Sequence, residues 1–181
     1  PKKRIFDCIP HNWDSKFRDI TVEALKNEKL PEPKFAYIGT PNKKDQADRK
    51  FYKYKDITYL GQVAKKKDIG TFNVCASFRT EFNSIYKPGT KCAVAASFNA
   101  MFIANKHEYG VYDLLGPDYP YYLEKTDEEN MDKMINYIKE TYKTPIWDKA
   151  MKIIKEVKEK TDVRNIAKQF IKHIENHFDD K

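Results

Sequence analysis

Short apolar segments, each followed closely by a glycine, a proline or another turn-forming residue, constrain the fold of this chain most. Six segments of four to six residues have this character, and their apolar residues do not alternate with polar ones. Strands that lack alternation are typical of sheets buried on both faces. The predicted strands span residues 4–9, 34–38, 57–60, 73–77, 100–104 and 121–124.

Stretches of helical composition separate several of these segments, at residues 16–29, 65–72, 90–99 and 108–115. Strands that alternate with helices in short units predict a parallel sheet with right-handed crossovers and helices on both faces. The predicted fold class is therefore α/β, a doubly wound, Rossmann-like parallel sheet of about six strands, with a helical C-terminal extension.

From Asp127 onward the apolar residues recur with the helical period of about 3.6 residues. Thr126 or Asp127 is expected to cap the first of three helices, and the next two are expected to contain Ile146–Val157 and Val163–Ile174. A chain of 181 residues suffices for one domain of ordinary size. We expect an α/β core over residues 1–126 and C-terminal helices over 127–181, packed on the same domain.

The charge balance favours an anionic partner. Lys and Arg number 34 against 27 Asp and Glu, a formal net charge of +7. Nucleic acid, phosphorylated metabolites and an acidic membrane surface all suit such a chain. Only five of the basic residues are arginines, whereas proteins that read bases usually rely on arginine.

The apolar runs and the cysteines indicate the compartment. No apolar run reaches ten residues, far short of the roughly 20 that a membrane span needs, so no transmembrane segment is expected. Cys8, Cys75 and Cys92 form no Cys-x-x-Cys pair, so neither a disulfide framework nor a zinc site is indicated. Buried free thiols are typical of a reducing compartment, and we expect a cytoplasmic protein.

The loop at residues 77–91 is the best candidate for a phosphate site. It follows a predicted strand and opens a predicted helix, whose N-terminus favours an anion. Thr90 could cap that helix, and Pro88-Gly89 would let the backbone approach a ligand closely. The cations that could neutralise a phosphate are Arg79, Lys87 and Lys91. A solvated basic turn is the alternative, since the chain contains neither G-x-x-x-x-G-K-[ST] nor G-x-G-x-x-G.

Two further pairs stand at predicted strand ends. His11 and Asp14 follow the first strand and could orient a phosphate or an acceptor, and His107 and Glu108 follow the fifth and could reach a sugar. A capping turn for the first pair and a helix-capping role for the second are the simpler explanations. In a doubly wound sheet the ligand crevice lies outside the carboxyl ends of the strands. The loops that carry these two pairs and the loop at 77–91 would therefore line the same crevice.

The order of strands and helices, with S-F-R-x-E at residues 77–81 and K-P-x-T-K-x-x-x-A at 87–95, resembles the C-terminal, donor-binding half of GT-B glycosyltransferases. The resemblance extends over about residues 1–178. It implies a domain that holds a nucleotide-diphosphate sugar, without a metal or other cofactor, for transfer to an acceptor. Thr90 and the cations of the loop would hold the phosphates.

The resemblance also implies a ribose contact and a second half. Glu81 would be the first of two glutamates eight positions apart, one of which contacts the ribose, but Gly89 stands at the second position. The acceptor-binding half is expected from an N-terminal domain missing here or from a partner subunit, and the catalytic base is expected there too.

A second function class remains open from the residues themselves. The chain could be a basic α/β binding module for nucleic acid or a protein partner, without catalysis. It would then use the lysine-rich segment 42–55 and the terminal helices rather than one crevice.

Overall fold

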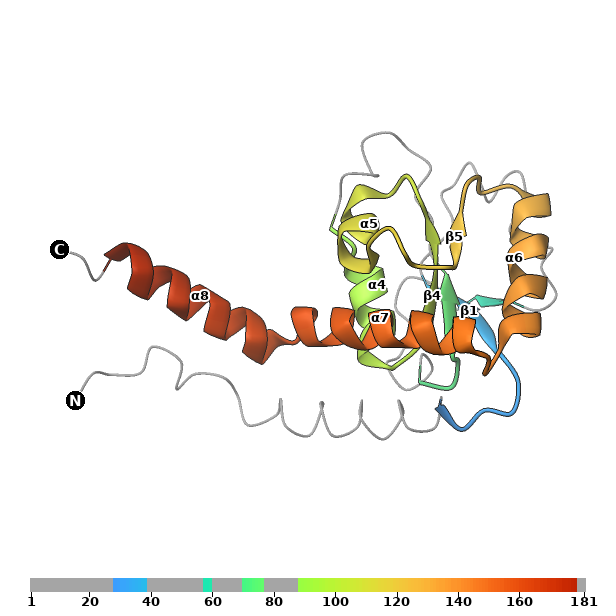
Figure 1. Ribbon diagram of the computed structural model, residues 1–181, viewed down its shortest axis with the longest axis horizontal. Coiled ribbons are helices and arrows are strands. Elements are labelled where there is room, and N and C mark those ends of the chain that lie inside the picture. The colour runs from blue at the N-terminus through green and yellow to red at the C-terminus, as the bar shows by residue number, and fades with distance from the viewer. Residues whose placement is uncertain (1–27, 39–56, 60–69, 77–87, 179–181) are drawn as a thin grey trace.

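A computed structural model describes residues 28–38, 57–59, 70–76 and 88–178 of this chain. Within them, five parallel strands form one sheet in the order β2-β1-β3-β4-β5 (Figure 1). The strands are β1 (Phe35–Tyr37), β2 (Ile57–Tyr59), β3 (Val74–Ala76), β4 (Met101–Asn105) and β5 (Tyr122–Leu123). The predicted α/β class with a parallel sheet is confirmed, with five strands rather than about six. The expected strand at residues 4–9 lies outside the described residues.

The register of the sheet sets where its two ends lie. Phe35 of β1 pairs with Ile57 of β2 on one side and with Val74 of β3 on the other, and Val74 pairs with Met101 of β4. In chain order, β2 is added on one side of β1, whereas β3, β4 and β5 are added on the other side. The switch point of the sheet therefore lies between β1 and β3. In open α/β sheets, ligands bind outside the carboxyl ends of the strands at this kind of switch point.

Helices lie on both sides of the strands. In Figure 1, α4 (Thr90–Ser97) and α5 (Tyr109–Leu115) lie on one side and α6 (Glu128–Thr141) on the other. Asp127 is the N-cap of α6 and accepts the backbone N–H of Asn130 at 2.9 Å, as the sequence predicted. The prediction of a helix over 65–72 is wrong for residues 70–72, the part that the structure describes. Gly70 and Thr71 form a turn, and Phe72 has no regular structure.

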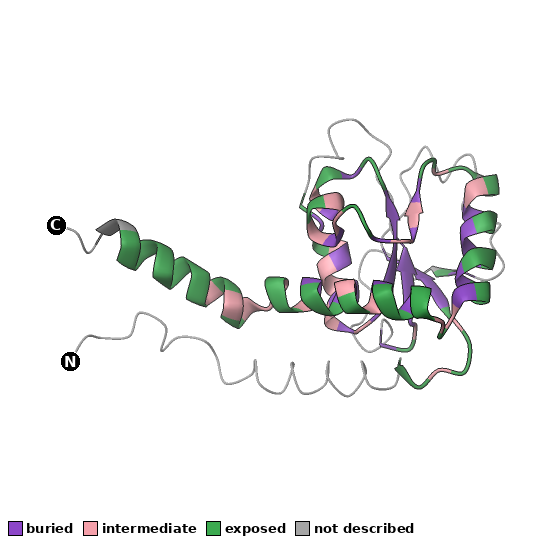
Figure 2. Cartoon of the chain, in the orientation of Figure 1, coloured by how far each residue is buried: buried purple, intermediate pink, exposed green. Residues whose placement is uncertain are grey.

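The longest fully buried strand of the described residues is β4. All five of its residues are buried, and Figure 2 shows this strand at the centre of the buried region. The strand has partners along both edges and helices on both sides, which explains why its apolar residues do not alternate with polar ones.

The long helix α7 (Pro145–Thr161) runs across the amino-terminal ends of the strands. Asn99 stands just before β4, and its Oδ1 accepts a hydrogen bond of 2.7 Å from Nζ of Lys158 on α7. Tyr121 stands just before β5, with its ring 6.3 Å from that of Trp147. The buried side chains of α7 are those of Trp147, Ala150, Ile154 and Val157. The helix α7 therefore covers the starts of β4 and β5.

A buried amide joins the same end of the sheet to the turn after α6. Asn73, directly before β3, accepts the backbone N–H of Lys34 at 2.7 Å and donates to the hydroxyl of Tyr142 at 3.0 Å. The Tyr142 hydroxyl in turn donates to the backbone oxygen of Leu30 at 2.6 Å. These bonds connect the segments that precede β1 and β3 with the C-terminal helices. The division expected at residue 127 stays a prediction, although buried residues of α6 and α7 belong to the same core as the sheet.

A tyrosine hydroxyl completes the edge of β4 that faces β5. Because β5 has only two residues, it pairs with Ala104 and Asn105 and does not reach Phe102. The buried Tyr119 hydroxyl fills this place: it accepts the N–H of Phe102 at 3.1 Å and donates to its carbonyl at 2.6 Å. Burial holds the pKa of Tyr119 well above its usual value, so the hydroxyl keeps its proton.

Removing this hydroxyl should destabilise the fold. In Tyr119→Phe, a buried N–H and a buried carbonyl of Phe102 lose their partner, and we expect the free energy of unfolding to fall by about 2–3 kcal/mol. Urea denaturation followed by circular dichroism measures it. Tyr137→Phe, at a ring on the surface of α6, is the control and should change stability by less than about 0.5 kcal/mol. Equal effects of the two substitutions would contradict this role for Tyr119.

Candidate functional site

The starts of α4 and α5 meet at the end of the sheet opposite to α7. A Cβ built on Gly89, the residue before α4, would lie 2.6 Å from the backbone oxygen of Gly110 on α5 and 2.8 Å from Cδ1 of Leu114. Gly89 therefore permits close packing of the two helices. The sequence predicted a close backbone approach at this glycine, and the partner that approaches it is α5 of the same chain.

Four of the residues singled out from the sequence lie at these helix starts. Thr90 and Lys91 begin α4, and His107 and Glu108 directly precede α5, so the contact of Gly89 with Gly110 makes the two pairs neighbours. The other predicted site residues lie outside the described residues: His11, Asp14, Arg79, Glu81 and Lys87.

Thr90 does not have the role that was expected of it. The N-cap of α4 is Gly89, without a side-chain cap, and Thr90 is the first helical residue, with an exposed side chain and its N–H donating to the Pro88 oxygen at 2.8 Å. The prediction of a Thr90 cap is wrong because the helix begins at Thr90 itself, one residue earlier than a threonine cap requires. Lys91 follows in the first turn and is half-buried.

Glu108 is a buried carboxyl residue at the carboxyl end of β4, with 2% of its surface exposed. It is the N-cap of α5 through its backbone, because its carbonyl accepts the N–H groups of Val111 and Tyr112, both at 2.9 Å, while its side chain makes no cap bond. Glu108 therefore caps α5 through its main chain and not through its side chain. Its carboxyl group lies beside α4, where its negative charge helps to raise the pKa of Cys92.

Asn105, the last residue of β4, orders the turn that carries His107. Its buried side-chain oxygen accepts the N–H of His107 at 3.0 Å, and its backbone oxygen accepts the N–H of Glu108 at 3.0 Å. The His107 side chain is exposed. The sequence analysis did not single out Asn105, although a polar residue that closes a fully apolar strand was a usable signal.

Two buried thiols lie beneath this corner. Burial, which is the larger cause, raises the pKa of both Cys75 and Cys92 to about 12, with further contributions from Cys92 to Cys75 and from Glu108 to Cys92. Both stay protonated near neutral pH and are poor nucleophiles. The prediction of buried free thiols is confirmed for these two residues, and Cys8 lies outside the described residues.

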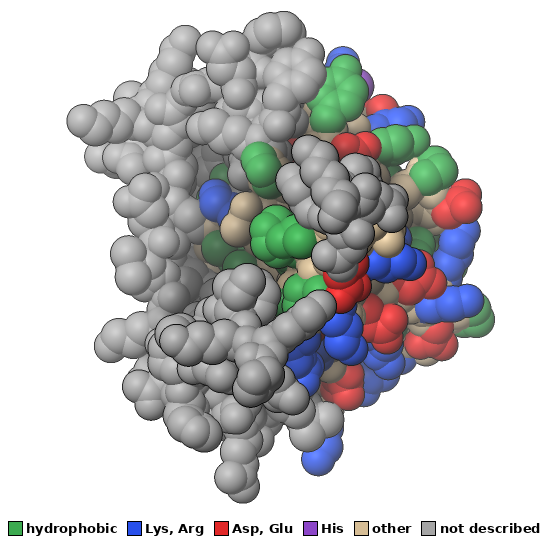
Figure 3. Space-filling view, turned by 90° about the vertical axis from the view of Figure 1, so that its left-hand side faces the viewer, with side chains coloured by type: hydrophobic (Ala, Val, Ile, Leu, Met, Phe, Trp, Pro, Cys, Tyr) green, Lys and Arg blue, Asp and Glu red, His purple; other side chains and the backbone are tan. Residues whose placement is uncertain are grey.

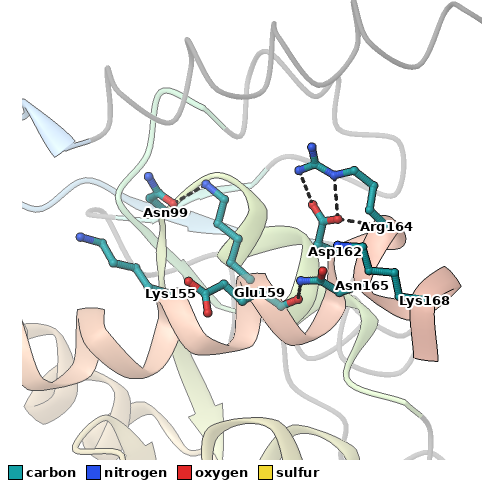
Figure 4. A pocket seen from close by; sticks show the side chains of 8 residues that line it. Asn99, Lys155, Glu159, Asp162, Arg164, Asn165 and Lys168 are labelled. Atoms are coloured by element: carbon teal, nitrogen blue, oxygen red, sulfur yellow. Dashed lines mark hydrogen bonds and ion pairs between the residues drawn. The ribbon is translucent and has the colours of Figure 1, made fainter. Parts of the chain in front are cut away.

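A hollow of about 700 Å³ lies at the joint between α7 and α8 (Val163–Phe178), away from the carboxyl edge (Figure 4). Two of its cations have partners: Lys158 donates to Asn99, and Arg164 bonds Asp162 through two nitrogens, both at 3.0 Å. The hollow is lined by Asn99, Lys155, Lys158, Glu159, Asp162, Arg164, Asn165 and Lys168. Its mixed charges favour a solvated joint over an anion site.

Comparison with known proteins gives no relative. No protein-family model, no curated protein and no solved structure matches this chain. Among the residues that the structure describes, no cluster of three or more His, Cys, Asp or Glu side chains could hold a metal ion. The helices in that part of the chain are all too short or too polar to cross a membrane.

The packing at Gly89 predicts a stability effect. Gly89→Ala would push a methyl group against the Gly110 carbonyl and Leu114, and we expect it to lower the free energy of unfolding by about 1–3 kcal/mol. Thr90→Ala, at the adjacent exposed side chain, should stay within about 0.5 kcal/mol of the parent. Thermal unfolding of the two variants measures the difference, and a stable Gly89→Ala protein would show that α4 and α5 pack less closely.

The buried thiols predict a loss of stability in alkali. Their pKa is about 12 in the folded chain and about 9 in the unfolded chain, so above pH 9 the unfolded state releases these protons first and unfolding becomes easier. Each thiol should lower the free energy of unfolding by about 1.4 kcal/mol per pH unit between pH 9 and 12. When the free energy of unfolding is measured by urea denaturation in reducing buffer across this range, its fall with pH should be shallower by that amount in Cys92→Ala. An unchanged slope would mean that Cys92 titrates in the folded protein.

Proposed function

We propose that the carboxyl edge of this sheet binds the diphosphate of a nucleotide sugar, as the donor-binding half of a GT-B glycosyltransferase does. The observation that carries the proposal is the meeting of the α4 and α5 starts at that edge, with Lys91 and Glu108 on the two sides of the contact. At the opposite edge, α7 covers the starts of β4 and β5.

The start of α4 suits a phosphate. The first backbone N–H groups of a helix have no acceptors within the helix and carry partial positive charge. Lys91 adds a full positive charge within that first turn. A lysine bound to phosphate makes charge-assisted hydrogen bonds, which stabilise the negative charge that builds on a departing nucleotide. Arg79 and Lys87, in the preceding loop, are proposed from the sequence to add to this charge.

The start of α5 suits a sugar or ribose. Hydroxyl groups donate readily to a carboxylate, and Glu108 holds its carboxyl group out of bulk water, where such bonds are stronger. The exposed His107 could contact the same ligand from the turn that Asn105 orders. Under this proposal the acceptor and the catalytic base come from an N-terminal domain or a partner subunit.

Acidic and basic side chains are mixed on the described surface away from α8. On the face shown in Figure 3, acidic and basic side chains of the described residues lie intermingled. The helix α7 likewise mixes five lysines with Asp148, Glu156 and Glu159. A nucleic-acid surface is typically a continuous basic patch, and neither this face nor α7 forms one among the described residues.

Nucleotide binding tests the proposal. We expect uridine diphosphate or another nucleoside diphosphate to bind the full chain weakly, with amide chemical-shift changes grouped at 88–92 and 105–110. Lys91→Ala should weaken binding about tenfold or more, because a charge-assisted hydrogen bond contributes roughly 1.5–3 kcal/mol. Lys152→Ala, at an exposed lysine of α7, is the matched control and should leave binding unchanged.

Two outcomes would contradict the proposal. Equal effects of the two lysine substitutions would mean that the start of α4 is only a basic turn. Tight binding of DNA or RNA with a steep salt dependence, and no response to nucleoside diphosphates, would favour the basic binding module.

A further inference from the structure

The last helix, α8, extends away from the sheet and its helices. It follows α7 after the single residue Asp162, and in Figure 1 it projects beyond the body of the described chain. Its side chains from Lys168 to Asn176 are all exposed. Because α8 begins at the amino-terminal end of the sheet, its surface is separate from the proposed nucleotide site.

One face of α8 is apolar and lies in solvent. Its apolar residues recur at the spacing of a single helical face and are Val163, Ile166, Ala167, Phe170, Ile171 and Ile174. The four largest are exposed over 49% (Ile166), 55% (Phe170), 38% (Ile171) and 39% (Ile174) of their surface. Large apolar side chains grouped on one exposed face mark a surface that another body covers.

A row of cations borders this face. Lys168 and Lys172 are spaced four residues apart, and Arg164, which bonds Asp162, stands four residues before Lys168, so the three lie one above another along the helix. Lys168 is three residues before Ile171, which places the row next to the apolar face. Glu175 is the one acidic residue of α8. The partner should therefore offer apolar material beside negative charge.

We infer that α8 docks lengthwise on an anionic lipid surface. Helices with a broad apolar face and basic residues on the polar side bury the apolar face among acyl chains, while the cations contact the headgroups. Each Lys or Arg close to an anionic leaflet adds to the attraction. A second copy of this chain is less suitable, because pairing two α8 helices through these faces would bring two rows of cations alongside each other.

Vesicle binding tests the inference on the full chain. We expect the protein to sediment with vesicles of phosphatidylcholine and phosphatidylserine but not with phosphatidylcholine alone, and to be released by salt. Phe170→Ser and the double variant Lys168→Glu, Lys172→Glu should each weaken binding at least tenfold. Ile146→Ser and Lys152→Glu, at exposed positions of α7, are matched controls and should bind like the parent.

Several results would overturn the inference. No binding to anionic vesicles, or equal losses in the α8 variants and the α7 controls, would exclude docking through α8. A dimer of the parent in analytical ultracentrifugation that Phe170→Ser abolishes, without vesicle binding, would assign the face to a second copy. Because the substituted side chains are exposed, the variants should keep the circular dichroism and melting temperature of the parent.

Discussion

The structure depends on the complete burial of β4. Met101–Asn105 is covered along both edges and on both sides, and every backbone group in such a strand needs a hydrogen-bond partner within the protein. β3 supplies partners along one edge, but β5 is too short to supply them all along the other. The Tyr119 hydroxyl takes the place of the absent strand residue at Phe102. One side chain thus lets a two-residue strand close the sheet.

The two ends of the sheet differ in what covers them, and this difference directs the functional interpretation. At the amino-terminal end, α7 packs across the strands and the Asn73–Tyr142 bonds connect the preceding segments to the C-terminal helices. At the carboxyl end, two helix starts meet through Gly89 and Gly110, and a buried carboxyl group lies beside them. Parallel strands bring all their carboxyl ends to one edge, so polar groups from separate loops gather there.

The proposed nucleotide site and the proposed lipid-binding face of α8 would place two kinds of anion contact on different parts of the molecule. The proposed diphosphate site relies on few cations held at a helix start, whereas α8 presents a row of cations beside an apolar face. An overall charge of +7 is compatible with both and distinguishes neither. Their separation means that each can be removed by substitution while the other remains, which makes the two proposals independent.

The sequence by itself determined the elements whose signals are local. Apolar runs closed by turn residues marked β1 to β5, and the period after Asp127, with its capping carboxylate, marked α6 to α8, because side-chain spacing and caps act within a few residues. Only the tertiary structure decided that Gly89 packs on α5 and that Gly89 rather than Thr90 precedes α4. It also decided that Tyr119 completes the edge of β4. Likewise, only the tertiary structure placed α7 across the amino-terminal edge of the sheet and α8 away from the sheet. These features join residues distant in sequence or turn on a one-residue shift of a helix start, and no local pattern encodes such contacts.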